Sequence, residues 1–555
     1  MSIELLANEE EALAAAWRLQ RTGNFVAAFD AAQECLNRWP GSLPLQHLGI
    51  LALASCGSTR AALAAYRTSG LADSDVEDFL ALEARLLKDV AFQAGANHQR
   101  ALLIQAAEAY ERIVARTRGS YPAQNAAFLW ALAGNESRAM QLATSVVRDL
   151  ATVKVPADPE AAYFYWATVA EAALVLRDES GLSAAVDAAN TVCRRNLWAR
   201  TRTISQMRRL LPLRSDCREI ILRWHVPAVG FVFPSSEPFS PAEDMELIDA
   251  ADAAVLVYEA SSGRVARQGL ADFGSELHVI MPNAPVDDQS PGPINLVLNR
   301  QTSGQRAGYT WSSLLLDESR DNEHWCAEVA LGLSLGLAEA LHAPWWVLRE
   351  VEGRWCQYQP RDSAGFCREF SRRVDADGRT TRYALFFADA VGYSTLNASQ
   401  IRQYWSKLLP QTGAQVLRRH ADAMIFSKTW GDAVHGVFTS AAAAARAALE
   451  MTAATAGLAE DLAEGRRLEF RMALHYGAAD QGLDPIEDSP SYFGPQLSLA
   501  ARIVPVVPPG GVFVTEAFAA QLSLEGAQDL ACTYVGSTEL AKGYGHVRLL
   551  SLAWR

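Results

Sequence analysis

The 555-residue sequence lacks the features that direct a chain out of the cytosol or into a membrane. A secretory signal begins with a positive region and continues with an apolar one, whereas residues 9–11 are three consecutive glutamates. The most apolar long stretch, 327–348, contains Glu328, Glu339 and Pro344, and a membrane-spanning helix needs about 20 nearly uninterrupted apolar residues. The eight cysteines are scattered and form no C-x-x-C pair, which is typical of reduced thiols. We therefore expect a cytoplasmic protein with no membrane span.

The sequence also has too little positive charge to attract a polyanion as a whole. Lys and Arg total 50 against 63 Asp and Glu, a net charge of -13, so a nucleic acid would need a local basic patch. Nine arginines gather within 194–223. We interpret them as part of a final amphipathic helix whose arginines are solvated or pair with acids of the next domain, rather than as an anion-binding strip. We predict no nucleic-acid partner.

The absence of three motifs excludes further kinds of catalytic and binding site. The sequence has no H-E-x-x-H zinc motif, no G-x-S-x-G nucleophile motif and no G-x-G-x-x-G phosphate loop. What is present is typical of a globular protein, since half of the residues are hydrophobic and a fifth are charged. At roughly 100–200 residues per domain, this length predicts three or four domains.

Residues 1–222 predict an all-α array of helical repeats. The stretch is rich in Ala and Leu with helical periodicity, and a Gly-x-x-x-Ala-Ala pattern that starts at Gly23 recurs 34 residues later at Gly57, with a related copy at Gly134. Each glycine ends one helix, and the small alanines let the next helix pack closely. A helix-turn-helix period of 34 residues resembles the tetratricopeptide repeat. This resemblance favours a concave surface that binds a protein or peptide partner; the alternative is an array that packs only against its own chain.

Residues 223–375 predict an α/β domain with a parallel sheet. Short β-branched runs at 228–233, 253–258, 276–281 and 345–348 alternate with helix-like stretches, which is the β-α-β pattern. This segment resembles a Rossmann-type module, although its glycines do not form the dinucleotide-binding fingerprint. A ligand sensor and a degenerate spacer both stay open.

Residues 378–555 carry the strongest chemical pattern. A strand at 383–388 leads directly into Asp389, and a strand, a tight Gly-Asp turn and a second strand place Asp432 at the tip of a hairpin. Carboxylates on adjacent strand ends can hold a pair of hard divalent cations through oxygen, and such a pair can activate a hydroxyl and clamp a transferring phosphoryl group. Further on, Gly494 opens a helix on which Ser498 and Arg502, four residues apart, share one face.

The order of these elements resembles the catalytic domain of class III adenylate/guanylate cyclases over residues 381–555. The motifs that carry the resemblance are F-A-D-x-x-G-Y-S, K-T-x-G-D-A-V and G-x-x-x-S-L-A-A-R. The resemblance implies an α+β ferredoxin-like fold and two Mg²⁺ or Mn²⁺ ions per active site. It implies that Asp389, Asp432 and the backbone carbonyl of Ala390 are the metal ligands. Because the family's site forms between two cyclase domains, one such domain per chain implies a homodimer.

The same resemblance assigns the substrate contacts. Lys428 matches the family's purine-selecting lysine, and Ser491 falls where the partner of that lysine lies. Arg502 matches the arginine that neutralises phosphate charge in the transition state, and Lys542 is a candidate triphosphate contact. In the family an asparagine that orients the ribose stands at the position of Ser498, and the shorter serine leaves that role in doubt.

We therefore predict a cytoplasmic signalling enzyme that converts ATP, a nucleoside triphosphate, into 3′,5′-cyclic AMP and pyrophosphate. We expect the N-terminal parts to sense a partner or ligand, and residues 378–555 alone to keep the chemistry and lose control. Two alternatives stay open. One is a pyrimidine cyclase that makes cyclic CMP or cyclic UMP, as similar bacterial defence cyclases do. The other is a catalytically inactive nucleotide-binding scaffold, which the substitution at Ser498 favours.

Overall fold

The computed structural model describes three parts of the chain. The N-terminal part comprises residues 8–21, 23–93, 96–192 and 197–224, and the C-terminal part comprises 381–458, 468–541 and 545–555. Between them the described residues are 228–232, 245–248, 255–259, 278–280, 298–299, 328–329, 331–336, 338–339, 345–351, 354–360 and 365–366. In these residues no helix is both long and apolar enough to cross a membrane.

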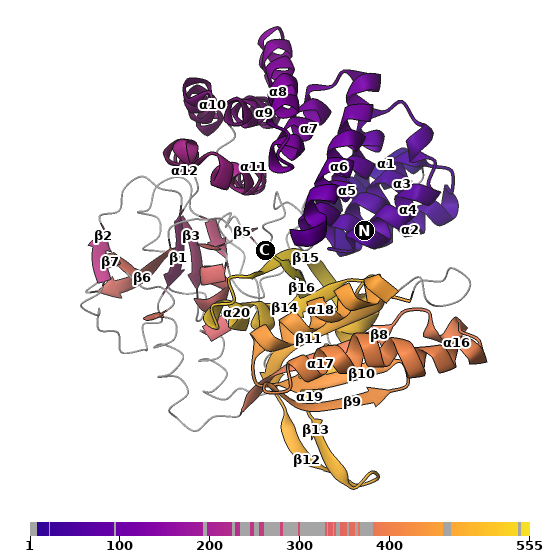
Figure 1. The fold of residues 1–555 in the computed structure, drawn as a ribbon. Helices are drawn as coiled ribbons and strands as arrows, with labels where there is room; N and C mark the ends of the chain where they lie inside the picture. Colours follow the sequence, from indigo (N-terminus) through magenta and orange to yellow (C-terminus); the bar gives the residue numbers. More distant parts are fainter. Residues whose placement is uncertain are drawn as a thin grey trace.

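The N-terminal part is a stack of helices, as predicted (Figure 1). Each of the three glycines at the starts of the repeat copies has a positive φ, 77° at Gly23, 89° at Gly57 and 84° at Gly134. Each follows the end of a helix, where glycine adopts the left-handed conformation at low cost. The helices are α1 (Glu9–Arg21), α2 (Phe25–Arg38), α3 (Leu43–Ser55), α4 (Thr59–Thr68), α5 (Glu77–Gln93), α6 (Ala96–Thr117), α7 (Ser120–Leu132), α8 (Glu136–Ala151), α9 (Pro159–Leu176), α10 (Glu179–Thr191), α11 (Leu197–Leu210) and α12 (Arg218–Leu222).

Helix α11 packs against α5, α7 and α9, which are alternate helices of the stack. The Gln206 side chain accepts a hydrogen bond from the Lys88 ammonium (3.3 Å) and donates one to Glu171 (2.9 Å). The Arg209 guanidinium lies 4.0 Å from the ring centroid of Phe92. Burial raises the pKa of the Glu171 carboxyl to about 7. Helix α11 therefore packs within the helical array through Gln206 and Arg209.

The middle sheet contains all four predicted strands, β1 (Ala228–Val232), β3 (Val255–Glu259), β4 (His278–Ile280) and β6 (Trp345–Val351). Strand β1 pairs in parallel with β3 and β6, and β3 pairs in parallel with β4. The sheet also contains three strands that the sequence analysis did not anticipate, β2 (Met245–Ile248), β5 (Leu298–Asn299) and β7 (Arg354–Pro360). These strands pair antiparallel with their neighbours. The strand order is β2-β7-β6-β1-β3-β4-β5.

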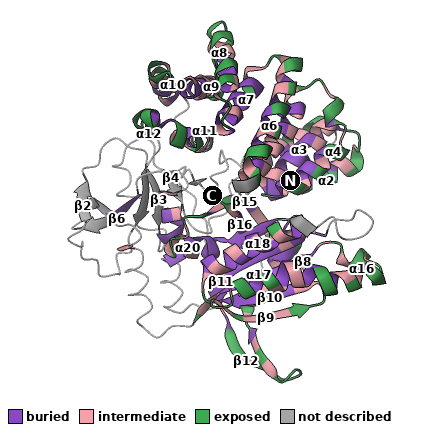
Figure 2. Ribbon diagram, in the orientation of Figure 1, coloured by how far each residue is buried: buried purple, intermediate pink, exposed green. Residues whose placement is uncertain are grey.

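The C-terminal part is built on a seven-stranded sheet in the order β15-β16-β14-β11-β8-β10-β9. The strand Arg382–Ala390, next to the middle strand of the sheet, pairs antiparallel with both of its neighbours and is buried along most of its length (Figure 2). The strands are β8 (Arg382–Ala390), β9 (Met424–Trp430), β10 (Ala433–Phe438), β11 (Phe470–Ala478), β14 (Val512–Thr515), β15 (Leu530–Leu540) and β16 (Gly545–Trp554). A separate hairpin of β12 (Asp480–Asp484) and β13 (Ser489–Phe493) projects from the body (Figure 1).

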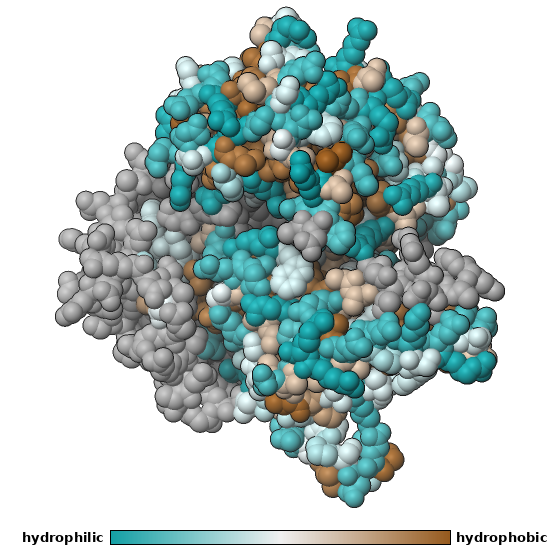
Figure 3. All heavy atoms as spheres, in the orientation of Figure 1, coloured by the Kyte–Doolittle hydropathy of each residue, from teal (hydrophilic) through white to brown (hydrophobic). Residues whose placement is uncertain are grey.

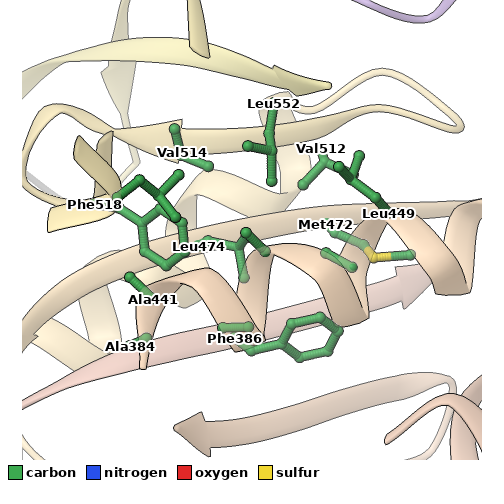
Figure 4. Packing of buried hydrophobic residues seen from close by; sticks show 14 of the residues in the cluster. Ala384, Phe386, Ala441, Leu449, Met472, Leu474, Val512, Val514, Phe518 and Leu552 are labelled. Atoms are coloured by element: carbon green, nitrogen blue, oxygen red, sulfur yellow. The ribbon is translucent and has the colours of Figure 1, made fainter. Parts of the chain in front are cut away.

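Successive residues of strand β8 belong to two different hydrophobic cores. Ala384 and Phe386 face helices α18 (Ala441–Leu458) and α20 (Glu516–Leu524), in the cluster that Figure 4 shows. Leu385 and Phe387 belong to the second core, which includes residues of helix α19 (Pro495–Ile503). Burial on both faces explains why strand β8 reads as a continuous apolar run.

Both hydrophobic cores of the C-terminal part extend into other parts of the chain. Helical residues 331–336 and strand β6 contribute to the first core, where a Cβ built on Gly332 would lie 2.5 Å from the Ala520 carbonyl oxygen. The second core includes Phe25 and Val26 of α2, which packs on strand β15. Hydrophobic packing therefore connects α2 and residues 331–336 to the C-terminal sheet.

Candidate active site

Asp389 is held near the end of strand β8. It stands opposite Arg471 of β11 and Ala433 of β10 in the antiparallel ladder, and its side chain is 21% exposed. The next residue, Ala390, ends the strand and pairs with Phe470. The rigid strand therefore presents one carboxylate and the neighbouring backbone at the rim of the sheet.

Asp432 reaches the same rim from the β9–β10 hairpin. Trp430 and Ala433 pair across a two-residue turn, whose first residue, Gly431, has a φ of 62° that favours glycine. Burial, with a contribution from the nearby negative charge of Asp389, raises the pKa of the Asp432 carboxyl. The two acids are thus close enough to interact electrostatically, and the charged form of Asp432 is destabilised.

A buried tyrosine is hydrogen-bonded to the backbone of Asp432. The Tyr404 hydroxyl donates a hydrogen bond to the Asp432 backbone carbonyl (3.1 Å). Burial and the charges of both aspartates raise the pKa of this phenol, so it stays a neutral donor. Tyr404 begins a π-helical stretch that follows α16 (Ala398–Gln403), and π-helical turns are frequent at functional sites.

Arg471 is a site residue that the sequence analysis missed. Its Nε donates to Asp389 Oδ2 at 2.8 Å and its Nη2 lies 2.7 Å from the same oxygen. Its Nη1 lies 3.5 Å from the Pro505 carbonyl, just after α19. The available signal was a charged residue in the otherwise apolar strand Phe470–Ala478. Arg471 joins the carboxylate rim to the end of the helix that carries Ser498 and Arg502.

The oxygen donors at this rim suit hard divalent cations. Two neighbouring carboxylates, with a backbone strand end beside them, match the donor type that Mg²⁺ and Mn²⁺ prefer. Within the described ranges no group of three or more His, Cys, Asp or Glu residues forms a metal cluster.

Helix α19 packs on the face of the sheet that forms the second core, and it carries Ser498 and Arg502. Leu497, Leu499 and Ile503 are buried, which leaves Ser498 and Arg502 only partly covered. The helix is anchored by buried His475, whose ring nitrogens lie 2.7 Å from Gln496 Oε1 and 2.8 Å from Thr515 Oγ1. Burial lowers the pKa of His475 to about 4, so this anchor is a neutral imidazole.

Lys428 lies on β9 and its ammonium contacts acids rather than Ser491. It forms an ion pair with Glu487, and Asp484 Oδ2 lies 4.0 Å away. Ser491 is on β13, where it pairs across the ladder with Gly482. Lys542 lies outside the described residues. The structure thus brings Asp389, Ala390 and Asp432 together, and it places Lys428 next to the acidic turn of the β12–β13 hairpin.

Two parts of the chain are similar to known proteins. Residues 25–130 match the family model "TPR-S: Tetratricopeptide Repeats-Sensor". None of the curated proteins matches the chain. Solved structures with similar folds include the guanylate cyclase domain of RhGC from Catenaria anguillulae in complex with GTP, with 18% identity over 31% of this chain and 97% of that one and a TM-score of 0.27.

Two adenylate cyclase structures are also similar. The adenylyl cyclase CyaB from P. aeruginosa has 18% identity over 32% of this chain and 97% of that one, with a TM-score of 0.27. An adenylate cyclase from Trypanosoma brucei has 20% identity over 32% of this chain and 90% of that one, with a TM-score of 0.27. The chain joins an N-terminal array of tetratricopeptide-like repeats to a C-terminal α/β domain that resembles the catalytic domains of adenylate and guanylate cyclases.

Proposed function

We propose that the chain is a nucleotide cyclase that converts ATP into 3′,5′-cyclic AMP and pyrophosphate. The observation that carries this proposal is the convergence of Asp389 and Asp432 at one rim of the sheet, with Arg471 beside them. Two carboxylates and one guanidinium suit a bound metal–polyphosphate complex, because such chemistry needs positioned charges rather than a covalent nucleophile.

Asp389, Asp432 and the Ala390 carbonyl would hold two Mg²⁺ or Mn²⁺ ions. When bound, these ions activate the ribose 3′-hydroxyl and neutralise charge on the α-phosphate and on the leaving pyrophosphate. Arg471 adds a fixed positive charge at the polyphosphate end, since its strand register keeps it opposite Asp389. Arg502 supplies transition-state charge from α19, and Ser498 and Lys542 complete the ribose and triphosphate contacts in this proposal.

The proposed active form is a homodimer. Large apolar side chains are exposed on strand β9 and the projecting hairpin, where Figure 3 shows apolar residues near the tip; they are Ile425, Trp430, Leu483, Ile486 and Phe493. Ile486 is 91% exposed. Exposed apolar groups gathered near Lys428 fit a surface that is covered by a second copy of the chain. The metal-binding carboxylates of one subunit would then lie opposite the base-binding residues and the transition-state arginine of its partner.

The N-terminal array is proposed to regulate this reaction. Helix α2 packs on β15, the strand that ends two residues before Lys542 in the sequence. A ligand or protein that shifts the first repeats would move a strand of the catalytic sheet. A rate that does not respond to removal or occupation of the repeats would contradict this part of the proposal.

The test is a mass-spectrometric assay of the full chain with Mn²⁺ and ATP, GTP, CTP or UTP supplied separately. We expect one cyclic product, lost by more than about a hundredfold in D389A and in D432A. D422N is the matched control, since Asp422 is an exposed acid in the turn before β9. Metal-dependent nucleotide binding without any product would overturn the catalytic assignment and favour the scaffold alternative. A cyclic pyrimidine product would replace the ATP assignment.

A further inference from the structure

We infer that Tyr404 and Trp405 are positioning residues that set the spacing between the two carboxylates at the rim of the sheet. This inference rests on the proposed function, because it concerns the same candidate metal site. The carrying observation is that these two consecutive residues donate hydrogen bonds to two different loops. One loop contains Asp432 and the other directly follows Asp389, and we call the two donors the Tyr404–Trp405 clamp.

Tyr404 holds the turn that contains Asp432. Its side chain is fully buried, and its hydroxyl donates to the backbone carbonyl of Asp432 at 3.1 Å, across 28 positions of sequence. This bond is made to the backbone of Asp432 and uses neither oxygen of its carboxylate. It therefore restrains the point from which the carboxylate extends, and it does not compete with a metal ion for that carboxylate.

Trp405 holds the turn that follows Asp389. Its indole Nε1 donates to the hydroxyl of Tyr393 at 2.9 Å. Tyr393 lies four residues after Asp389 and begins a short 3₁₀ turn, Tyr393–Thr395. The ring of Tyr393 also meets the ring of Tyr404 edge to face, with 4.9 Å between the ring centroids. The clamp therefore holds this turn with both a hydrogen bond and a ring contact.

The helical segment that carries the clamp is fixed at its start and irregular where the clamp begins. Helix α16 starts with a capping box, in which the Asn397 side chain accepts hydrogen bonds from two backbone N–H groups and Gln400 Oε1 accepts one from the Asn397 backbone. From Tyr404 to Leu408 the segment is π-helical. A π-helical turn inserts a residue and redirects the side chains that follow, and such turns occur frequently at functional sites.

The spacing of the two carboxylates matters most for an ion that requires strict geometry. Ligands that are fixed before a metal binds lose less conformational freedom on binding. Hydrogen bonds that orient metal ligands typically change metal affinity or activity by about 10–100-fold when they are lost. Mg²⁺ requires near-ideal octahedral geometry, whereas the larger Mn²⁺ tolerates longer and less regular bonds. We therefore expect a loosened clamp to impair the use of Mg²⁺ more than the use of Mn²⁺.

The experiment compares metal binding and turnover in the full chain. Binding of Mn²⁺ alone is followed by electron paramagnetic resonance, and turnover is measured over a range of Mn²⁺ or Mg²⁺ concentrations. Y404F removes only the phenolic hydroxyl, and W405F removes the indole N–H. We expect each variant to bind Mn²⁺ about fivefold more weakly or worse, and to lose more turnover with Mg²⁺ than with Mn²⁺. A loss of folded protein would lower turnover equally with both metals.

Matched variants serve as controls. Y534F removes a buried hydroxyl that has no hydrogen-bond partner among the described residues, and W554F changes a partly exposed tryptophan at the end of β16. We expect both to keep the wild-type Mn²⁺ affinity and the wild-type ratio of Mg²⁺ to Mn²⁺ turnover. Y393F removes the acceptor of the Trp405 hydrogen bond, so we expect it to reproduce W405F.

The outcomes separate the clamp from the cyclase proposal. Trp405 is 44% exposed, so W405F and Y393F test the clamp even where Y404F lowers stability. Wild-type Mn²⁺ affinity in these variants overturns the clamp, and turnover that falls equally with both metals reduces its role to folding and also overturns it. Weakened Mn²⁺ binding in the variants, without any cyclic product from wild type, contradicts the cyclase proposal alone. A wild-type chain that binds no Mn²⁺ overturns both.

Discussion

The Arg471 Nη2 atom lies 2.7 Å from Asp389 Oδ2, so the carboxylate proposed as a metal ligand is already paired with a cation. The ladder register that places Arg471 opposite Asp389 makes this pairing a property of the sheet. A metal ion that binds Asp389 must compete with the guanidinium. The site is therefore expected to bind metal weakly until a polyphosphate offers Arg471 another anionic partner.

The first prediction concerns metal affinity without nucleotide. R471Q removes the competing charge, so we expect Mn²⁺ to bind the variant at least about threefold more tightly than wild type, while turnover of nucleotide falls. Calorimetric titration with Mn²⁺ alone measures the affinity. R446Q is the control, because Arg446 forms a similar ion pair with Asp529 (2.8 Å) away from the rim. Equal affinity in R471Q and wild type would show that the guanidinium does not compete.

The second prediction concerns pH and the buried His435. Its ring stacks on Phe387 with 4.5 Å between centroids, and neither ring nitrogen has a partner among the described residues. Burial lowers its pKa to about 4, against about 6.5 in the unfolded chain. Between these values the unfolded state binds more protons, so the free energy of unfolding declines as the pH falls from about 6.5 to about 4.

Phenylalanine has a shape similar to that of histidine and has no ring nitrogen that needs a hydrogen-bond partner. We expect H435F to be as stable as wild type or slightly more stable at pH 7, and to gain relative stability as the pH falls toward 4. Urea unfolding of both proteins across this range provides the measurement. Parallel stability curves would mean that His435 has a normal pKa in the folded protein.

The third prediction concerns fragment boundaries. A fragment that starts at 378 lacks helical residues 331–336, whose Leu331, Leu333 and Leu335 are buried in the first core. We expect it to melt at least about 10 °C below a fragment that starts at 325, because each buried leucine contributes about 1.5–3 kcal/mol. Calorimetric melting of the two fragments decides the matter. Equal melting temperatures would show that 378 is a true folding boundary.

The fourth prediction concerns the close approach at Gly332. A methyl group at this position would meet the Ala520 carbonyl oxygen at 2.5 Å and the Ala520 Cα at 2.9 Å. We expect G332A to destabilise the full chain by about 1–3 kcal/mol, although alanine normally favours a helix. In the control G41A the new methyl group has no atom within 4 Å. Chemical denaturation of both variants tests the contact, and a neutral G332A would refute it.

Sequence patterns predicted the features that depend on neighbouring residues. The strand before Asp389, the Gly431–Asp432 turn and the repeat glycines are local arrangements, and all are present. The contacts of Arg471 and Glu487 join residues 82 and 59 positions apart. Such pairings depend on strand register and on the turn of the β12–β13 hairpin, which no local pattern specifies. The shared cores were missed for the same reason, since periodicity shows that a face is apolar but not what covers it.

The packing of α2 on β15 has a consequence for synthesis of the protein. Phe25 and Val26 leave the ribosome early, yet their cluster also contains Val547 and Leu549 from the last strand of the chain. At about 5–20 residues per second, the apolar face of α2 waits roughly 25–100 s for that strand. During this interval the nascent chain presents an uncovered hydrophobic surface to chaperones and to other chains. Completion of the C-terminal sheet is therefore also the event that protects the first repeat from aggregation.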